Sequence, residues 1–304
     1  MIGLDAAPEL APYQTQPAQM PAASVGKVGR LRLCFAQRGE RTILAHLYRQ
    51  APLLVQRALY WDEEMPEMAC VYVLTTSGGI LQGDRLGIDI ELAAGARAHV
   101  TTQAATKIQQ MDANYGVQTQ RATLAADSYL EYLPEPTIPY RDSRFLTHTE
   151  LRVDPSATLL YGETLMPGRK YHAGGEIFAY EVFSSTLRAA RPQGPELFVE
   201  KFLIEPGRHD VARLGVMGGF HVFANVVLMT PPEVAARVFD RTTPTWDDGT
   251  PLIAAASRLP NDAGLIYKVL GTESEPVRDA VRAFCAIARE EAVGRAVPRP
   301  FAWR

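Results

Sequence analysis

The sequence predicts a mainly β protein, built as a β-helix-like (solenoid) stack of strands with a few α-helices near the C-terminus. Three observations predict this class. Apolar and polar residues alternate through much of the chain, one strand–turn–strand plan recurs three times, and helical spacing appears only after residue 230. The composition is that of a folded globular protein, since 47% of the 304 residues are hydrophobic and 21% are charged.

The first 26 residues are rich in Pro, Ala and Gln. They have neither the basic opening nor the continuous apolar core of a secretion signal. We therefore expect residues 1–26 to be a disordered or extended N-terminal segment. Residues 27–304 are expected to form a single β-rich domain that carries the C-terminal helices.

The first strands are predicted by a period of two. Leu31, Leu33 and Phe35 alternate with less apolar residues, and the segment 86–92 alternates in the same way. This period is typical of a half-buried strand. A short apolar run over 71–74 suits a more buried strand.

A weak internal repeat follows, over residues 88–103, 119–135 and 149–164. Each copy has an alternating strand, a tight turn and a second strand, and the turns centre on Gly95, Asp127 and Ser156, at spacings of 32 and 29 residues. Such spacing favours stacked strand layers, as in a solenoid. The alternative is an ordinary sandwich of hairpins.

Helical spacing appears late in the chain. Pro231 and Pro232 precede a helix-like segment, and helices are also predicted over Thr250–Arg258 and Glu275–Gly294. Thr272 and Glu275 have the spacing of a capping box at the start of the last helix. The helices expected over Pro231–Asp240 and Glu275–Gly294 are candidates for partner docking. The alternative is that their apolar faces cover the β-rich body.

Composition and spacing argue against several classes of protein. A formal net charge of −3 gives no sign of nucleic acid as the main partner, and no apolar run is long enough to span a membrane. The cysteines, Cys34, Cys70 and Cys285, are too far apart for a zinc motif, which fits a reducing cytoplasm. The six histidines lack the spacing of a zinc helix, so no tightly bound cofactor is expected.

The segment 78–84, GGILQGD, is the most distinctive local feature. Its glycines permit a tight turn, but it lacks the Lys-Ser/Thr of a phosphate-binding P-loop. The structural interpretation is a turn into the next strand. The functional one is that Asp84 presents a carboxylate oxygen, a ligand type that holds divalent ions.

Other carboxylates lie at equivalent strand ends. If the layers stack, Thr102, Glu135 and Glu163 come close together. Paired carboxylates are used by glycosidases, so a β-helical carboxylate-based hydrolase is one alternative. No aromatic-lined groove is evident in the sequence to support it. An interaction scaffold is another alternative.

Several blocks together resemble the UreD (UreH) family of urease accessory proteins. They are GGILQGDRLGIDIEL with GARAHVTTQAATK, then LEYLPEPTIPY, LLYGETLMPGR, FVEKFLIEP and AGLIYKVLG, and they run in the family's order from Gly78 to Gly271. Two departures are Gln82, where the family more often has glycine, and Ile108, where an aromatic residue often follows TTQAATK.

The resemblance implies a chaperone and not an enzyme. Members of this family act in the cytoplasm with the accessory proteins UreF and UreG, the latter a GTPase. The complex docks on apo-urease for urease maturation by nickel insertion, and an internal tunnel is thought to pass the metal. The protein is thus expected to be a scaffold and nickel conduit within a protein complex.

The resemblance also implies which residues meet the nickel ion on its path. Asp84 matches the acid of the family's GGD motif. Thr106, Glu163 and Glu200 stand where polar tunnel residues are expected. Isolated oxygen ligands suit a transit path, because clustered His and Cys would retain the metal.

Overall fold

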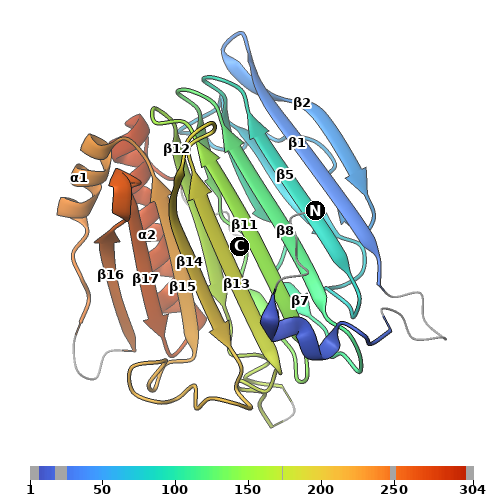
Figure 1. Ribbon diagram of the computed structural model, residues 1–304. Helices are drawn as coiled ribbons and strands as arrows, with labels where there is room; N and C mark the ends of the chain where they lie inside the picture. Colours follow the sequence, from blue (N-terminus) through green and yellow to red (C-terminus); the bar gives the residue numbers. More distant parts are fainter. Residues whose placement is uncertain (1–6, 18–25, 173, 247–250, 299–304) are drawn as a thin grey trace.

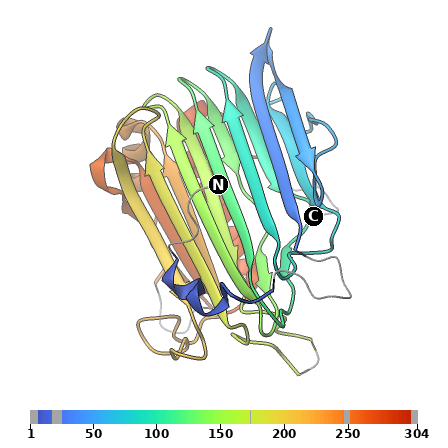
Figure 2. The same cartoon turned by 45° about the vertical axis from the view of Figure 1, so that its right-hand side comes forward.

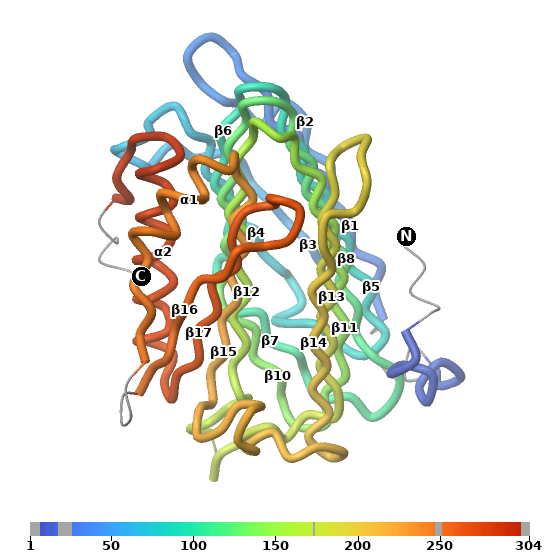
Figure 3. The backbone as a smooth tube through the Cα atoms, turned by 60° about the vertical axis from the view of Figure 1, so that its left-hand side comes forward, coloured from blue at the N-terminus to red at the C-terminus, as the bar shows by residue number. Residues whose placement is uncertain are grey.

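The computed structural model describes residues 7–17, 26–172, 174–246 and 251–298. Within them the protein consists of two facing β-sheets, with two α-helices packed against the outer face of the larger sheet (Figure 1). Figure 3 shows the two sheets in profile, with the helices on one side. The prediction of a mainly β fold with few helices is confirmed.

The smaller sheet has seven strands, in the order β14-β13-β11-β8-β5-β1-β2. They are β1 (Val28–Arg38), β2 (Arg41–Gln50), β5 (Arg85–Leu92), β8 (Gly116–Leu124), β11 (Arg144–Val153), β13 (Val182–Ala190) and β14 (Glu196–Ile204).

The larger sheet has the order β16-β17-β15-β12-β9-β6-β4-β3, and β10 and β7 extend it from β12. Its strands are β3 (Leu53–Leu54), β4 (Ala69–Thr75), β6 (Arg97–Thr102), β7 (Thr106–Ile108), β9 (Tyr129–Tyr132), β10 (Thr137–Pro139), β12 (Thr158–Leu165), β15 (Val222–Met229), β16 (Leu252–Arg258) and β17 (Leu265–Gly271).

The three repeat segments lie side by side. Their first strands, β5, β8 and β11, pair in parallel in the smaller sheet, and their second strands, β6, β9 and β12, pair in parallel in the larger one. The turns stack as well, because the Gly95 N–H donates to the Ala126 carbonyl at 3.0 Å and the Asp127 N–H donates to the Ser156 hydroxyl at 2.9 Å. Strand register therefore carries equivalent residues of each segment to neighbouring positions. The solenoid class itself stays a prediction.

Two apolar cores follow from the alternation. The residues of one parity, such as Leu33, Ile90 and Leu159, fill the space between the sheets. On the other face of the larger sheet, Val226 and Tyr267 pack against the helices. Both faces of the larger sheet are therefore buried at its C-terminal strands, which suits their nearly continuous apolar sequence.

Two of the three expected helices are present. They are α1 (Pro232–Arg241) and α2 (Ser274–Val293), and both cover the outer face of the larger sheet. The capping box at the start of α2 is absent, since Glu273 is the N-cap and makes no side-chain capping bond. Gly294, at φ +66°, ends the helix in the left-handed conformation that favours glycine.

The helix predicted over Thr250–Arg258 is wrong. Leu252–Arg258 forms strand β16, which pairs antiparallel with β17 along its whole length. Three consecutive alanines give this segment helical propensity, but the free edge of β17 offers it a complete set of backbone hydrogen bonds. Tertiary pairing therefore overrides the local preference. Thr250 lies outside the described residues.

The N-terminal segment is better ordered than its sequence suggests over the part described, residues 7–17. Pro8–Tyr13 forms a 3₁₀ helix that crosses the outer face of the smaller sheet (Figure 2). Leu10 is fully buried there, and the Glu9 carboxylate accepts hydrogen bonds from Ser184 at 2.5 Å and from Lys201 at 2.9 Å. An apolar patch on the sheet, which includes Tyr115 and Leu146, anchors the helix against expectation.

None of the helices that the structure describes is long and apolar enough to cross a membrane.

Candidate functional site: a polar cavity between the sheets

The space between the two sheets contains an elongated cavity. A water-sized sphere can enter about 120 Å³ of it. Its wall draws on successive layers of the stack, and in strand order it includes Leu53 and Val73, then Ile88, Thr102 and Thr106, then Gln120, Tyr132 and Glu135, then Thr147, Tyr161 and Glu163, and lastly Phe183, Phe202 and Phe223. The cavity thus runs across the strands, from the β3/β4 edge towards the edge where β14 faces β15.

Glu163 lies on this wall, on β12. The alternation of β12 turns Tyr161 and Leu165 into the core between the sheets, and Glu163 shares their parity. Its Oε1 accepts a hydrogen bond from the Ser185 hydroxyl on the opposite sheet, at 3.0 Å. Burial raises the pKa of Glu163, although hydrogen bonds from Ser185 and Tyr161 favour the ionised form. The carboxyl group is therefore held in a low-dielectric wall beside the cavity.

Two other sequence-predicted residues join it. Thr102 and Glu135 also line the cavity, and the Thr102 hydroxyl accepts a hydrogen bond from the Glu135 backbone N–H at 3.0 Å. Thr102, Glu135 and Glu163 therefore line one cavity, as the stacking of the layers predicts. Thr106, on β7, lines the same cavity.

A connected set of polar side chains lies on and next to the cavity wall. The Gln120 amide donates to Tyr161 at 3.2 Å and to Thr149 at 3.1 Å, and its carbonyl accepts a hydrogen bond from Tyr132. The Thr149 and Tyr161 hydroxyls also pair, at 3.0 Å. Because an unpaired buried polar group is costly, these mutual bonds keep oxygen-bearing side chains stable inside an apolar core. Sequence reasoning missed this network, because its members lie on four separate strands, β8, β9, β11 and β12.

Asp84 lies elsewhere. Its side chain is fully buried in the turn before β5, and both carboxylate oxygens are occupied by backbone N–H groups, Oδ1 by Lys27 at 2.8 Å and Oδ2 by Leu81 at 2.9 Å. It is absent from the cavity wall. Gly79 in the same turn, at φ +148°, has no room for a side chain, since a Cβ would lie 2.6 Å from the Lys107 carbonyl oxygen. The geometry supports the structural interpretation of this motif.

Glu200 is not among the residues that line the cavity, but it lies on the edge strand β14, two residues from Phe202, which is. It shares the parity of Phe198 and Phe202, which face the space between the sheets, and it forms an ion pair with Lys268 of β17. Of the four predicted metal-path residues, the structure therefore places Thr106 and Glu163 on the cavity wall, Glu200 beside its end and Asp84 in a separate turn.

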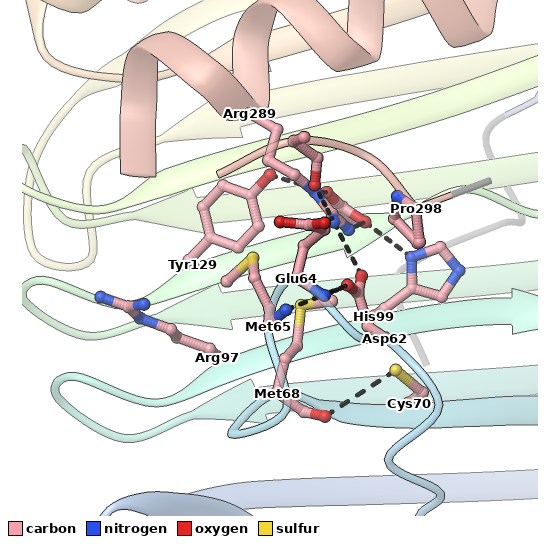
Figure 4. Close-up of polar contacts among 12 residues, drawn as sticks. Asp62, Glu64, Met65, Met68, Cys70, Arg97, His99, Tyr129, Arg289 and Pro298 are labelled. Carbon is pink, nitrogen blue, oxygen red and sulfur yellow. Dashed lines mark hydrogen bonds and ion pairs between the residues drawn. The ribbon is translucent and has the colours of Figure 1, made fainter. Parts of the chain in front are cut away.

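A second polar cluster lies on the other face of the larger sheet, under α2 (Figure 4). Arg289 binds both oxygens of Glu131, at 2.7 and 2.9 Å, and Asp62 at 2.7 Å, and His99 Nδ1 lies 2.7 Å from Glu131. All four side chains are buried. Burial alone would raise the pKa of Glu131, but hydrogen bonds from His99 and Arg289 outweigh it and hold this pKa well below its usual range.

This cluster fastens α2 to the sheet, and sequence reasoning missed it. Glu131 stands alone in the apolar run of β9, and Arg289 is four residues after Cys285 on the apolar face of α2. A charged residue on a buried face signals a buried partner, but 158 positions separate the two. Among the described residues, no group of three or more His, Cys, Asp or Glu could hold a metal ion.

The raised pKa of Glu163 predicts a pH-dependent effect of Glu163→Gln. A carboxyl group whose pKa is higher in the folded state than in the unfolded state lowers the free energy of unfolding as the pH rises through the folded-state pKa. Below the unfolded-state pKa of about 4.3 the group has no such effect. The variant should therefore gain stability relative to the wild type as the pH rises from about 4 to 8. Urea unfolding across this range measures the difference.

A matched variant sharpens this test. Ser185→Ala removes a hydrogen bond that favours the ionised carboxylate, so it should enlarge the gain from Glu163→Gln at neutral pH. If the difference in the free energy of unfolding between Glu163→Gln and the wild type does not change with pH, the raised pKa of Glu163 is contradicted.

Comparison with known sequences finds a family profile and near full-length relatives. The profile of the family described as "UreD urease accessory protein" matches residues 27–304. The chain is 54% identical over 300 residues to "Urease accessory protein UreD 2" of Brucella suis biovar 1 (strain 1330), which covers 99% of each chain. It is 49% identical over 298 residues to "Urease accessory protein UreD" of Photorhabdus laumondii subsp. laumondii, covering 98% of this chain and 93% of that one. It is also 49% identical over 309 residues to the protein of the same name from Yersinia enterocolitica, covering 100% and 94%. The chain therefore belongs to the UreD family of urease accessory proteins.

Proposed function

We propose that this protein is a non-catalytic chaperone of urease maturation in the cytoplasm, acting as scaffold and nickel conduit for insertion of the metallocentre. In this proposal it works in a complex with UreF and UreG, and the complex docks on apo-urease. Nickel is the cargo and binds only transiently. The observation that carries the proposal is the elongated cavity between the sheets, whose wall presents Thr106 and Glu163 within an apolar core.

The chemistry of the wall supports transit. A path must bind a borderline cation weakly at separate points, or the metal would remain at one of them. The wall offers isolated carboxyl, hydroxyl and amide oxygens, and no described cluster of three His, Cys, Asp or Glu that could hold a metal interrupts them. Burial raises the pKa of Glu163, so protons compete with a cation for this group and keep cation binding weak.

The small volume of the same cavity argues against the hydrolase alternative. Thr102, Glu135 and Glu163 do share a wall, but only about 120 Å³ lies between the sheets. Small-molecule sites usually occupy roughly 300–1,000 Å³, so a sugar chain does not fit. An interaction scaffold unrelated to urease is disfavoured by membership of the family.

Urease activation tests the conduit. The chain is co-expressed with urease, UreF and UreG in a host without urease, and the nickel content and activity of the purified urease are measured. We expect Glu163→Gln and Thr106→Val each to lower both readouts several-fold, because each removes an oxygen ligand from the wall with little change in shape.

Two controls separate transport from assembly. Glu150→Gln alters a carboxylate on the outer face of the smaller sheet, where Glu150 pairs with Arg121, and should leave activation unchanged. Co-purification of UreF, UreG and urease with the tagged chain should be the same for all variants. Full activation by the double variant Glu163→Gln, Thr106→Val would contradict the conduit.

A further inference from the structure

Three polar residues form a row across the larger sheet at the edge where it faces β14. Strand register places Glu163 of β12 opposite Asn225 of β15, and Asn225 opposite Lys268 of β17. Residues directly opposite one another in antiparallel strands point to the same face. That face is the one between the sheets, because Val227 and Ile266, which share the parity of the row, belong to the core there.

Asn225 is the unusual member of this row. Its side chain is 1% exposed, and in the part of the chain that the structure describes its Oδ1 has no hydrogen-bond partner. Buried polar atoms are nearly always paired, so an unpaired one is a candidate ligand for a water or an ion. Strand register places Asn225 between Glu163 and Lys268 in the row.

The opposite sheet supplies a second carboxylate. Glu200, on β14, reaches across to the Lys268 ammonium of β17, so this ion pair joins the two sheets. Close by, Phe202 of β14 meets Phe223 of β15 edge to face, with ring centroids 5.3 Å apart, and both rings line the end of the cavity. Lys268 thus pairs with Glu200 and lies next to Asn225 in the row, near the place where the cavity reaches this edge.

We propose that Glu163, Asn225 and Glu200 form a weak binding site for a divalent cation at this edge, and that Lys268 occupies the site until a metal ion displaces its ammonium group. The inference deepens the proposed function, on which it rests, by naming an entry point and a residue that controls it. Carboxylate and amide oxygens suit hard and borderline divalent ions. A competing ammonium offsets part of the negative charge when no metal ion is bound, and it makes metal binding readily reversible.

Nickel binding by the purified full-length chain tests the site, with NiCl₂ as the probe in equilibrium dialysis. Lys268→Met removes the competitor and should tighten nickel binding about threefold to tenfold, the factor expected for one unit charge near a divalent ion in a partly screened setting. Lys268→Arg keeps the charge and should bind like the wild type. Unchanged binding in Lys268→Met would overturn the proposal.

Substitutions of Asn225 provide a second test of the site. In the Lys268→Met background, Asn225→Leu should weaken nickel binding and Asn225→Asp should strengthen it. A purely structural asparagine would not give opposite effects, so equal binding by both variants would also overturn the proposal. Arg188→Met, which removes an exposed ion pair with Glu196 on the outer face, is the matched control and should change nothing. Thermal unfolding confirms that each variant is folded.

These outcomes separate the site from the conduit. Suppose that Lys268→Met tightens nickel binding but the double variant Glu163→Gln, Thr106→Val still activates urease fully. This result would support the cation site at the edge of the sheet and contradict the conduit. If the double variant fails to activate urease and Lys268→Met leaves nickel binding unchanged, only the cation site at the edge is contradicted.

Discussion

Replacing Arg289 by Met is expected to lower the free energy of unfolding by about 3–5 kcal/mol, the usual cost of leaving a buried charge without its partner. The guanidinium donates to both oxygens of Glu131 and to Asp62, and all three side chains are at most 3% exposed. Without it, two carboxylates face each other beneath α2. Urea unfolding at pH 7 measures the loss.

The control for this prediction lies on the same helix. Arg278 is exposed and has only weak contacts, at 3.8 and 3.9 Å, with carboxylates of its own helix, so Arg278→Met should cost less than about 1 kcal/mol. The low pKa of Glu131 adds a pH test. A carboxylate with a lowered folded-state pKa stabilises the protein above its unfolded value of about 4.3, and this contribution is lost as the pH falls. The difference in the free energy of unfolding between the wild type and Arg289→Met should therefore become smaller at acidic pH. A difference that stays constant with pH would contradict the lowered pKa of Glu131.

Replacing Asp84 by Ala is expected to cost about 2–4 kcal/mol. The carboxylate is the acceptor for the backbone N–H groups of Lys27 and Leu81, and each group left without a partner costs about 1–3 kcal/mol. The change should loosen the turn before β5. It should lower urease activation only in proportion to the loss of folded protein.

Two measurements on each Asp84 variant decide between structure and transport. Asp84→Asn keeps one acceptor oxygen and should fall between the wild type and Asp84→Ala in urea unfolding. Activation is compared at equal amounts of folded chain. An Asp84→Ala protein that is as stable as the wild type but fails to activate urease would show that the carboxylate serves the cargo and not the turn.

The sequence predicted the repeating layers because their signals are local. Alternation defined the strands, and the turn residues Gly95, Asp127 and Ser156 fixed how the segments align, which placed Thr102, Glu135 and Glu163 together. Once two segments stack in register, the neighbours of each side chain follow from counting residues.

Other features depended on contacts between distant segments. The strand at Leu252–Arg258 exists because β17 has a free edge, and the 3₁₀ helix at Pro8–Tyr13 is held by residues more than 100 positions away. Nothing near Asn225 in the sequence shows that it lies between Glu163 and Lys268. Only the pairing of β12, β15 and β17 does so.

The in-register stacking limits how such a chain can change over generations. Adding or deleting one residue within β12 would turn Glu163 to the face covered by the helices and bring Gly162 or Thr164 to the cavity, because side chains alternate with a period of two. A length change confined to the turns at Gly95, Asp127 or Ser156 spares that pattern. Insertions and deletions that preserve activity should therefore gather at the turns, and whole layers are the natural unit by which the cavity could lengthen or shorten.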